Sequence, residues 1–167
     1  MRGHNYRIGN GMPMTNRKYA RGTPNVRIAR FQTGEARNDY EVRVQLTSKE
    51  VAQIRDNALE AARVSANKKM GTLADKGYWL SVRLYPHVVI SENKMIATAG
   101  ADRLQEGMRR AYGKPIGLAS RVRIGAVILQ IDTMESHLAQ AKTALKTASS
   151  KLPMPSLIKI EQLEKSS

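Results

Sequence analysis

Apolar and polar residues alternate along residues 40–46 (YEVRVQL), where every second side chain is apolar. This period of two predicts a half-buried strand with one face toward water. Residues 79–85 follow the same period, and we expect Trp79 in the core because tryptophan is highly buried on average. Further strands are predicted at 26–31, 87–90, 122–131 and 157–160. The most apolar of these, 122–131, is expected in the middle of a sheet, and 87–90, which follows Pro86, at an edge.

The first of two predicted helices begins at Thr47 and ends at Gly71. Thr47 and Glu50 have the spacing of a capping box, and glycine is a common helix terminator. Lysines near the end of this segment suit the negative end of the helix dipole. The expected apolar face consists of Val51, Ile54, Ala58, Ala61 and Ala62, with Glu60 and Arg63 on other sides.

A second helix is predicted to begin near Asp132 and Glu135 and to stop before Pro153, because proline cannot continue a helix. Its apolar side chains recur with helical spacing at Leu138, Ala141, Leu145 and Ala148. Runs of strands with two covering helices predict an α+β fold, a two-layer α/β sandwich with a mostly antiparallel sheet.

The division of the chain follows from where this periodicity is lost. Residues 1–25 have no period and are punctuated by glycine and proline, which predicts an extended basic arm that is ordered only when bound. Residues 26–163 are predicted to form a single domain with an internal basic loop at 99–117, and residues 164–167 a tail. The spacing of Leu104, Met108 and Ala111 suggests a short helix inside that loop.

Charge is strongly biased toward the basic side chains. The 167 residues contain 28 Lys and Arg against 14 Asp and Glu, a formal charge of +14. Residues 1–34 hold seven basic side chains and no acidic one, whereas residues 132–167 hold five lysines against four acids. A charge of this size favours a polyanionic partner. A membrane is disfavoured, since no apolar run approaches the ~20 residues of a spanning helix and no secretory signal is recognisable.

Residues 99–123 concentrate this bias. They carry six basic side chains against Asp102 and Glu106, and four glycines and Pro115 interrupt them. Guanidinium groups neutralise phosphates, and glycine lets the main chain approach a nucleic acid closely. The composition alone fits either a nucleic-acid contact or a solvated surface loop.

Catalytic and metal-binding patterns are not found. His4, His87 and His137 have no acidic neighbours at metal-ligand spacing, and the absence of cysteine excludes disulfides and thiolate sites. The spacing from Gly107 to Lys114 differs from that of a phosphate-binding P-loop, and Pro115 stands where Ser or Thr would contact magnesium. We therefore expect no enzyme activity, no cofactor and no metal.

Several longer stretches are similar to a known family. The string GADRLQEGMRRAYGKPIG (100–117), with PHVVISENKM (86–95) before it and RVRIGAVILQI (121–131) after it, resembles the archaeal and eukaryotic large-subunit ribosomal protein family L-ten-e, the counterpart of bacterial L-sixteen. NALEAARVSANKK (57–69) and KLPMP (151–155) also match. The resemblance runs from about residue 6 to residue 160, and an archaeal source is favoured.

The resemblance implies a sandwich bound to 23S-type rRNA in the large subunit of a cytoplasmic ribosome, with the loop 101–115 directed toward tRNA near the peptidyl transferase centre. The implied rRNA-binding residues are Arg17, Lys18, Arg21, Arg27, Arg30, Arg83, Lys94, Arg121 and Arg123. The implied tRNA-proximal residues are Arg103, Arg109, Arg110, Tyr112, Gly113 and Lys114. Other expected partners are 5S rRNA and neighbouring ribosomal proteins, with the free protein a monomer. The alternative is an RNA-binding regulator or RNA chaperone outside the ribosome, which would use the same basic surface.

Overall fold

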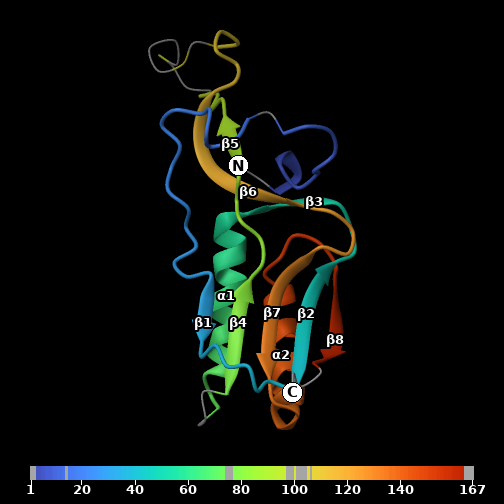
Figure 1. Ribbon diagram of the computed structural model, residues 1–167. Coiled ribbons are helices and arrows are strands. Elements are labelled where there is room, and N and C mark those ends of the chain that lie inside the picture. Colours follow the sequence, from blue (N-terminus) through green and yellow to red (C-terminus); the bar gives the residue numbers. More distant parts are fainter. Residues whose placement is uncertain are drawn as a thin grey trace.

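Two antiparallel sheets and two helices make up the computed structural model, which describes residues 3–13, 15–73, 77–96, 100, 105 and 107–163 (Figure 1). The larger sheet has the strand order β1 (Gln32–Gly34), β4 (Tyr78–Val82), β7 (Val127–Thr133), β2 (Val42–Ser48) and β8 (Ser156–Gln162). The smaller sheet has the order β3 (Ala52–Arg55), β6 (Lys114–Val122) and β5 (Val88–Glu92). The helices are α1 (Asp56–Met70) and α2 (Leu138–Ser149), and short 3-10 turns occupy Gly3–Asn5 and Glu135–His137.

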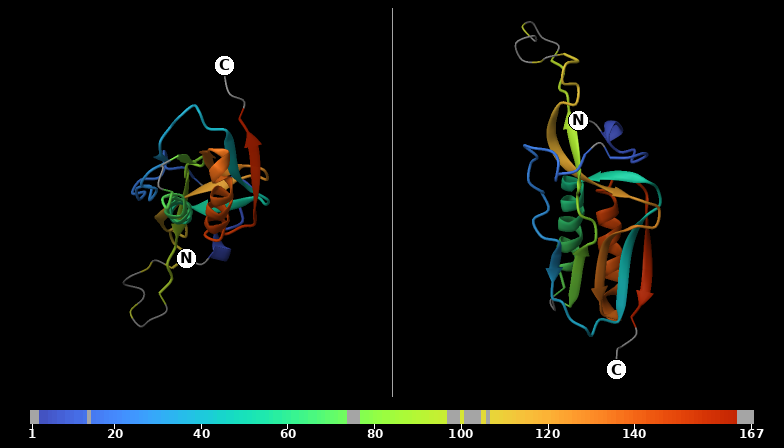
Figure 2. Two further views of the ribbon diagram at one scale, coloured as in Figure 1. Left: turned by 90° about the horizontal axis from the view of Figure 1, so that it is seen from below. Right: turned by 45° about the horizontal axis from the view of Figure 1, so that its top comes forward.

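The helices α1 and α2 pack side by side on one face of the larger sheet (Figures 1 and 2). Both helices bury alanines, among them Ala62 and Ala66 of α1 and Ala141 of α2, all fully buried. Small side chains allow two helices to approach closely, and the space between helices and sheet is filled by larger residues such as Leu129 and Leu145. The predicted α+β class, the antiparallel pairing and the two covering helices are confirmed, with the strands divided between two sheets.

The predicted helix start at Thr47 is wrong, because α1 begins only at Asp56. Thr47 lies in β2, where its hydroxyl donates to the carbonyl of Leu157 (3.1 Å), and residues 52–55 form β3 against β6. The capping-box spacing is a local signal, and pairing with strands distant in the sequence outweighs it. The buried face of α1 accordingly differs from the predicted one and consists of Asp56, Leu59, Ala62, Arg63, Ala66 and Met70.

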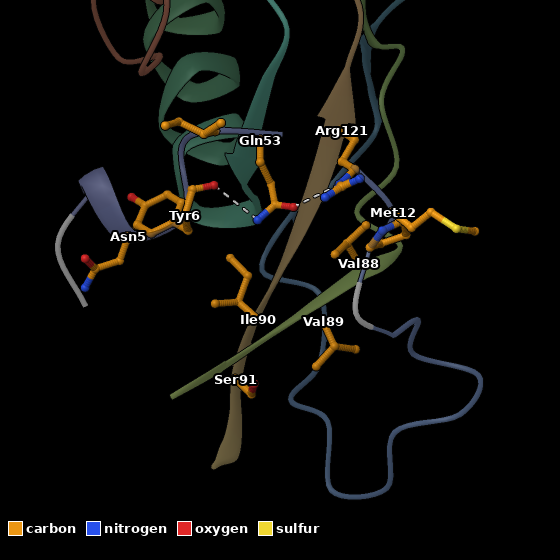
Figure 3. Close-up of a pocket in the computed structure, with 11 residues that line it drawn as sticks. Asn5, Tyr6, Met12, Gln53, Val88, Val89, Ile90, Ser91 and Arg121 are labelled. Carbon is orange, nitrogen blue, oxygen red and sulfur yellow. Dashed lines mark hydrogen bonds between the residues drawn. The ribbon is translucent and has the colours of Figure 1, made fainter. Parts of the chain in front are cut away.

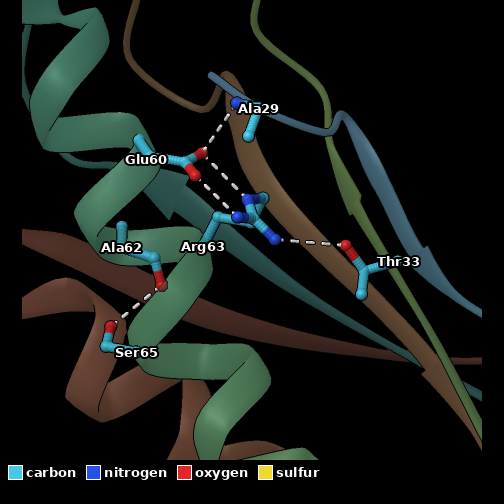
Figure 4. A network of polar contacts seen from close by, with 6 residues as sticks. All are labelled: Ala29, Thr33, Glu60, Ala62, Arg63 and Ser65. Carbon is cyan, nitrogen blue, oxygen red and sulfur yellow. Dashed lines mark hydrogen bonds and ion pairs between the residues drawn. The ribbon is translucent and has the colours of Figure 1, made fainter. Parts of the chain in front are cut away.

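Residues 26–30 do not form the predicted strand, and the strand β1 begins at Gln32. Their main chain is held by carboxylates of α1 instead. The N–H of Arg27 donates to Asp56 Oδ2 (3.1 Å), and the N–H of Ala29 donates to Glu60 Oε2 (3.3 Å; Figure 4). Because these N–H groups already have side-chain acceptors, they do not need the carbonyl groups of a neighbouring strand.

The apolar run 122–131 is divided between two strands. β6 ends at Val122, a turn containing Gly125 (φ +80°) follows, and β7 begins at Val127. Positive φ is readily adopted by glycine, so this residue allows the chain to pass from one sheet to the other. β7 lies in the middle of the larger sheet and β5 at an edge of the smaller one, as predicted.

Three smaller expectations also change. Trp79 is only half-buried, since β4 presents it on the face of the sheet that the helices do not cover. The internal loop ends before Lys114, where β6 begins, and its described residues 107–112 form turns rather than a helix. Asp132 is a buried residue of β7, so the second helix is preceded only by the turn that contains Glu135. The tail 164–167 lies outside the described residues.

Candidate nucleic-acid interface

The N-terminal arm and the smaller sheet lie together at one end of the molecule (Figures 1 and 2). The strands β5 and β6 pair as an antiparallel hairpin, and residues 93–96 and 107–113 of its connection extend beyond the two strands from this end. We call the arm residues 3–25, the smaller sheet and this hairpin the basic end, and the larger sheet with its two helices the body.

The arm covers both edges of the smaller sheet. At the β3 edge, Arg7 O accepts the N–H of Gln53 (2.8 Å), and the Gln53 side-chain amide donates to Tyr6 O (3.2 Å; Figure 3). At the β5 edge, the N–H of Val89 donates to Thr15 O and the N–H of Arg17 donates to His87 O, both at 3.2 Å. These bonds use main-chain groups of the arm and do not occupy its basic side chains, of which Arg7 is paired with Glu50 (3.2 Å).

Two hollows lie between the arm and the smaller sheet. A cavity of about 160 Å³ lies among Tyr6, Val88, Ile90 and Arg121 (Figure 3). Beside it, a groove of about 920 Å³ runs between arm residues 9–13 and the turn after β6, and Arg121 and Arg123 line it. The groove therefore presents two guanidinium groups beside an open space.

Arg121 is held in place by neutral groups. Its Nε donates to Gln53 Oε1 (3.3 Å), and its Nη1 donates to Gly11 O. The Arg121 side chain is half-buried, whereas Arg123 is exposed. Because neither contact contains an acid, the positive charge of Arg121 is oriented without being neutralised.

The hairpin is closed by specific contacts at its base. The Asn93 side chain donates to Gly107 O (3.1 Å), and the Gln105 side chain donates to Ile96 O (3.1 Å). Gly113 has φ +75°, and a Cβ at this position would lie 2.3 Å from the carbonyl of Glu92. Glycine is therefore required at position 113, where the main chain approaches Glu92 on the other side of the hairpin.

The turn 107–112 of the hairpin carries the exposed side chains predicted to lie near tRNA. Arg109, Arg110 and Tyr112 are exposed, and Arg110 has a left-handed backbone with φ +55°. Lys114, also predicted to lie near tRNA, is the first residue of β6 and pairs with Glu92. Arg103 lies outside the described residues.

The remaining predicted cations are spread more widely. Arg17, Lys18 and Arg21 are exposed on the arm, where the Arg17 side chain donates to Asn25 Oδ1 (3.2 Å). Lys94 is exposed on the hairpin. The exposed residues Arg27, Arg30 and Arg83 lie outside the basic end: the first two follow the arm alongside α1, and Arg83 follows β4.

Two arginines of the body differ from Arg121, because each of them is paired with a carboxylate. Arg43 donates through Nε and Nη2 to Asp132 (3.0 and 3.1 Å), and Arg63 donates in the same way to Glu60 (2.9 and 2.6 Å; Figure 4). Hydrogen bonds from Arg63 lower the pKa of the Glu60 carboxyl, and the bond to Asp132 raises the pKa of Arg43. The expectation that Arg63 points elsewhere than the packed face is wrong, since Arg63 is buried and also reaches Thr33 (3.3 Å), whereas Glu60 is not among the buried residues of α1.

Ion pairs with carboxylates involve four arginines in the described part of the chain, of which Arg7 belongs to the arm. The pairs are Arg7–Glu50, Arg37–Glu35, Arg43–Asp132 and Arg63–Glu60. Within the described residues, no such pair involves the following predicted interface residues: Arg17, Lys18, Arg21, Arg27, Arg30, Arg83, Lys94, Arg109, Lys114, Arg121 and Arg123.

Sequence reasoning did not single out Arg55, which belongs to the smaller sheet of the basic end. It ends β3, and its guanidinium lies over the Tyr6 ring at 5.4 Å from the centroid. Its Nε is buried without a hydrogen-bond partner in the described structure. The helix expected over 47–71 concealed this position, and the period of two along residues 52–55 was the signal that could have revealed it.

Metal binding and membrane spanning would each need a specific arrangement of residues. In the described part of the chain, no group of three or more His, Asp or Glu side chains is arranged to hold a metal ion. None of the described helices is both long enough and apolar enough to span a membrane.

Comparison with known proteins identifies the family. Residues 5–159 match the family described as ribosomal protein L16p/L10e. A large ribosomal subunit protein uL16 from Staphylothermus marinus is 49% identical over 92% of this chain and 89% of its own length. The uL16 proteins of Hyperthermus butylicus (48%; 92% of this chain, 86% of its own length) and Metallosphaera sedula (46%; 97% and 94%) are similar. The chain therefore belongs to the ribosomal protein L16p/L10e family, whose members are structural components of the ribosome rather than enzymes.

Proposed function

We propose that this protein is a structural constituent of the large ribosomal subunit that binds 23S-type rRNA through its basic end and helps to position tRNA with its hairpin. The observation that carries the proposal is that the predicted interface cations named above form no ion pair with a carboxylate in the described part of the chain, whereas Arg43 and Arg63 of the body do. Phosphates of RNA would supply the missing counter-charge. The names of the uL16 relatives support the place in the large subunit.

The groove beside Arg121 and Arg123 is the proposed site for the RNA backbone. Arginine can donate two parallel hydrogen bonds to one phosphate, which fixes the position of the RNA without reading its bases. Arg17, Lys18 and Arg21 would extend this contact along the arm, and Arg27, Arg30, Arg83 and Lys94 would contact RNA around it. The arm 1–25 would act as a binding segment of its own, attached to a single domain of residues 26–163.

The hairpin is the proposed tRNA-facing element. Its base is closed by Asn93 and Gly113, and the exposed side chains of Arg109 and Tyr112 are available for phosphates and for stacking. Arg110 would act beside them from the same turn. Lys114 would add a point charge at the base, and Arg103 would act from the same hairpin. We propose further that the free protein is a monomer and that 5S rRNA is within its reach.

Salt dependence of binding to a 23S-type rRNA fragment tests the rRNA part of this proposal. If around ten cations meet phosphates, the logarithm of the association constant should fall against the logarithm of salt concentration with a slope of about −7 to −9. Replacing Arg121 and Arg123 together by Gln should make that slope shallower by about 1.5. The control replaces the exposed Lys142 and Lys146 of α2 by Gln and should leave it unchanged. A wild-type slope near −2 would contradict an extensive phosphate interface.

Sedimentation separates the two cellular roles. We expect the protein to remain with large subunits through a high-salt wash, because many contacts are broken only together. A regulator or RNA chaperone outside the ribosome would be recovered in the supernatant.

A further inference from the structure

β8 is a long open edge of the larger sheet. It has seven residues and pairs only with β2 among the described strands, and Figure 1 shows no element beyond it. The other edges are short or covered: β1 has three residues, and the arm bonds to both edges of the smaller sheet. Open edges invite pairing with another chain, and proteins usually protect them.

The register shows which main-chain groups of β8 are unpaired. β2 and β8 pair without a shift, and flanking bonds run from Leu163 N–H to Glu41 O (2.8 Å) and from Lys49 N–H to Pro155 O (3.1 Å). Hydrogen-bonded pairs alternate along antiparallel strands. Counting inward from these two bonds, the N–H and C=O groups of Leu157, Lys159 and Glu161 point to β2, and those of Ile158, Ile160 and Gln162 point outward.

The side chains beside this edge are apolar on the helix-covered face. Ile158 and Ile160 pair with the fully buried Leu46 and Val44, yet Ile160 is 45% exposed. The core is therefore incomplete along β8, and apolar side chains of an added strand would cover it. Of the usual protections, β8 has neither a proline nor a bulge.

Charge indicates what kind of chain fits. β8 carries one lysine and one glutamate, and residues 132–167 are nearly neutral with five lysines and four acids. A neutral surface attracts phosphates weakly. A row of alternating N–H and C=O groups is matched by another extended polypeptide, whose main chain presents the same pattern.

We propose that β8 binds an extended segment of another protein, which adds a strand to the larger sheet and places apolar side chains at alternate positions over Ile158 and Ile160. This inference rests on the proposed place in the large subunit, where neighbouring proteins are within reach. It assigns the body to protein contacts and leaves RNA to the basic end.

Amide hydrogen exchange, resolved by residue, tests the geometry and the occupant together. In the free protein, the amides of Ile158, Ile160 and Gln162 should exchange fast, and those of Leu157, Lys159 and Glu161 slowly. In purified large subunits, exchange at the three outward amides should slow by about tenfold or more. Fast exchange at these amides in the subunit would overturn the proposal.

A photo-crosslinker placed at Gln162 identifies what covers the edge. In large subunits we expect a crosslink to one extended segment of a different ribosomal protein. A crosslink to rRNA, to a second copy of this chain or to nothing would overturn the proposal, and none of these results bears on the rRNA-binding slope measured separately with the isolated protein.

Proline substitution provides the matched test. Ile160→Pro removes an outward N–H, and proline is tolerated on edge strands, so melting temperature and rRNA-fragment affinity should stay close to those of the Ile160→Val control. For the Ile160→Pro protein, the yield of the crosslink from position 162 and the fraction of large subunits that contain the protein should both fall severalfold. Lys159→Pro, which removes an inward N–H, should lower the melting temperature. Normal crosslinking and occupancy of a folded Ile160→Pro protein would overturn the proposal.

Discussion

The body and the basic end differ in how their charged groups are satisfied. In the body, Arg43 and Arg63 each bond through two nitrogens to a carboxylate. In the basic end, Arg121 is oriented by an amide and a main-chain carbonyl. The first arrangement stabilises the fold, and the second holds a charge ready for a polyanion. Stability and binding should therefore separate by region, and four substitutions test this from the largest expected effect on stability to the smallest.

The largest effect is expected in the body. Leu145 is fully buried on α2, and Leu145→Ala should reduce the free energy of unfolding by about 2–5 kcal/mol because it leaves a cavity. Denaturant titration measures this, and the affinity of the folded variant for rRNA should not change. An affinity loss matching the stability loss would mean that the two regions are not separable.

Gly113→Ala tests whether the hairpin base depends on one glycine. The added Cβ would meet the Glu92 carbonyl at 2.3 Å in a backbone with φ +75°, so we expect a cost of about 1–3 kcal/mol, concentrated in the hairpin. Amide exchange at residues 92–94 and 113–115 measures the opening. Gly11→Ala is the matched control, since Gly11 has φ +76° but no atom within 4 Å of the place that a Cβ would occupy. Equal losses of stability from Gly113→Ala and Gly11→Ala would mean that the positive φ alone causes the cost, without the contact to the Glu92 carbonyl.

The Glu60–Arg63 pair predicts a pH dependence confined to the body. Arg63 lowers the folded-state pKa of Glu60 below its unfolded value near 4.3, so the pair stabilises the fold above about pH 5 and loses this contribution as pH falls through the folded pKa. Glu60→Gln should cost about 1–2 kcal/mol at pH 7 and less at pH 3. The exposed ion pair Arg37–Glu35 is the control, because the substitution Glu35→Gln should reduce the free energy of unfolding by less than about 1 kcal/mol. A cost for Glu60→Gln that is independent of pH would contradict this account.

The smallest change in stability is expected in the turn 107–112 of the hairpin. Arg109 is exposed, so Arg109→Glu should change the free energy of unfolding by no more than about 0.5 kcal/mol. The same substitution, like Lys114→Glu, should impair tRNA binding by reconstituted large subunits, because it places a negative charge near phosphates. If melting temperature and tRNA binding fell together, the hairpin would have a structural role.

Local patterns were sufficient where an element depends on its own residues. The alternation of residues 42–46 and the helical spacing of Leu138, Ala141, Leu145 and Ala148 appear in the structure as β2 and α2. The surplus of basic side chains in residues 1–34 is also visible in the sequence, and its described members are exposed in the structure. The family followed from the long matching string at 100–117.

Partners distant in the sequence decided the rest. Residues 47–55 satisfy the local rules for a helix start, and they are strands because β6, β7 and β8 offer paired hydrogen bonds and a buried face. Residues 26–30 alternate like a strand, and carboxylates of α1 bond to their main chain instead. No short window contains these partners. The sequence by itself determined the periodicity and the surplus of basic residues. Only the tertiary structure decided which cations are neutralised by acids and which strand edge of the larger sheet stays open, because both depend on groups that folding brings together.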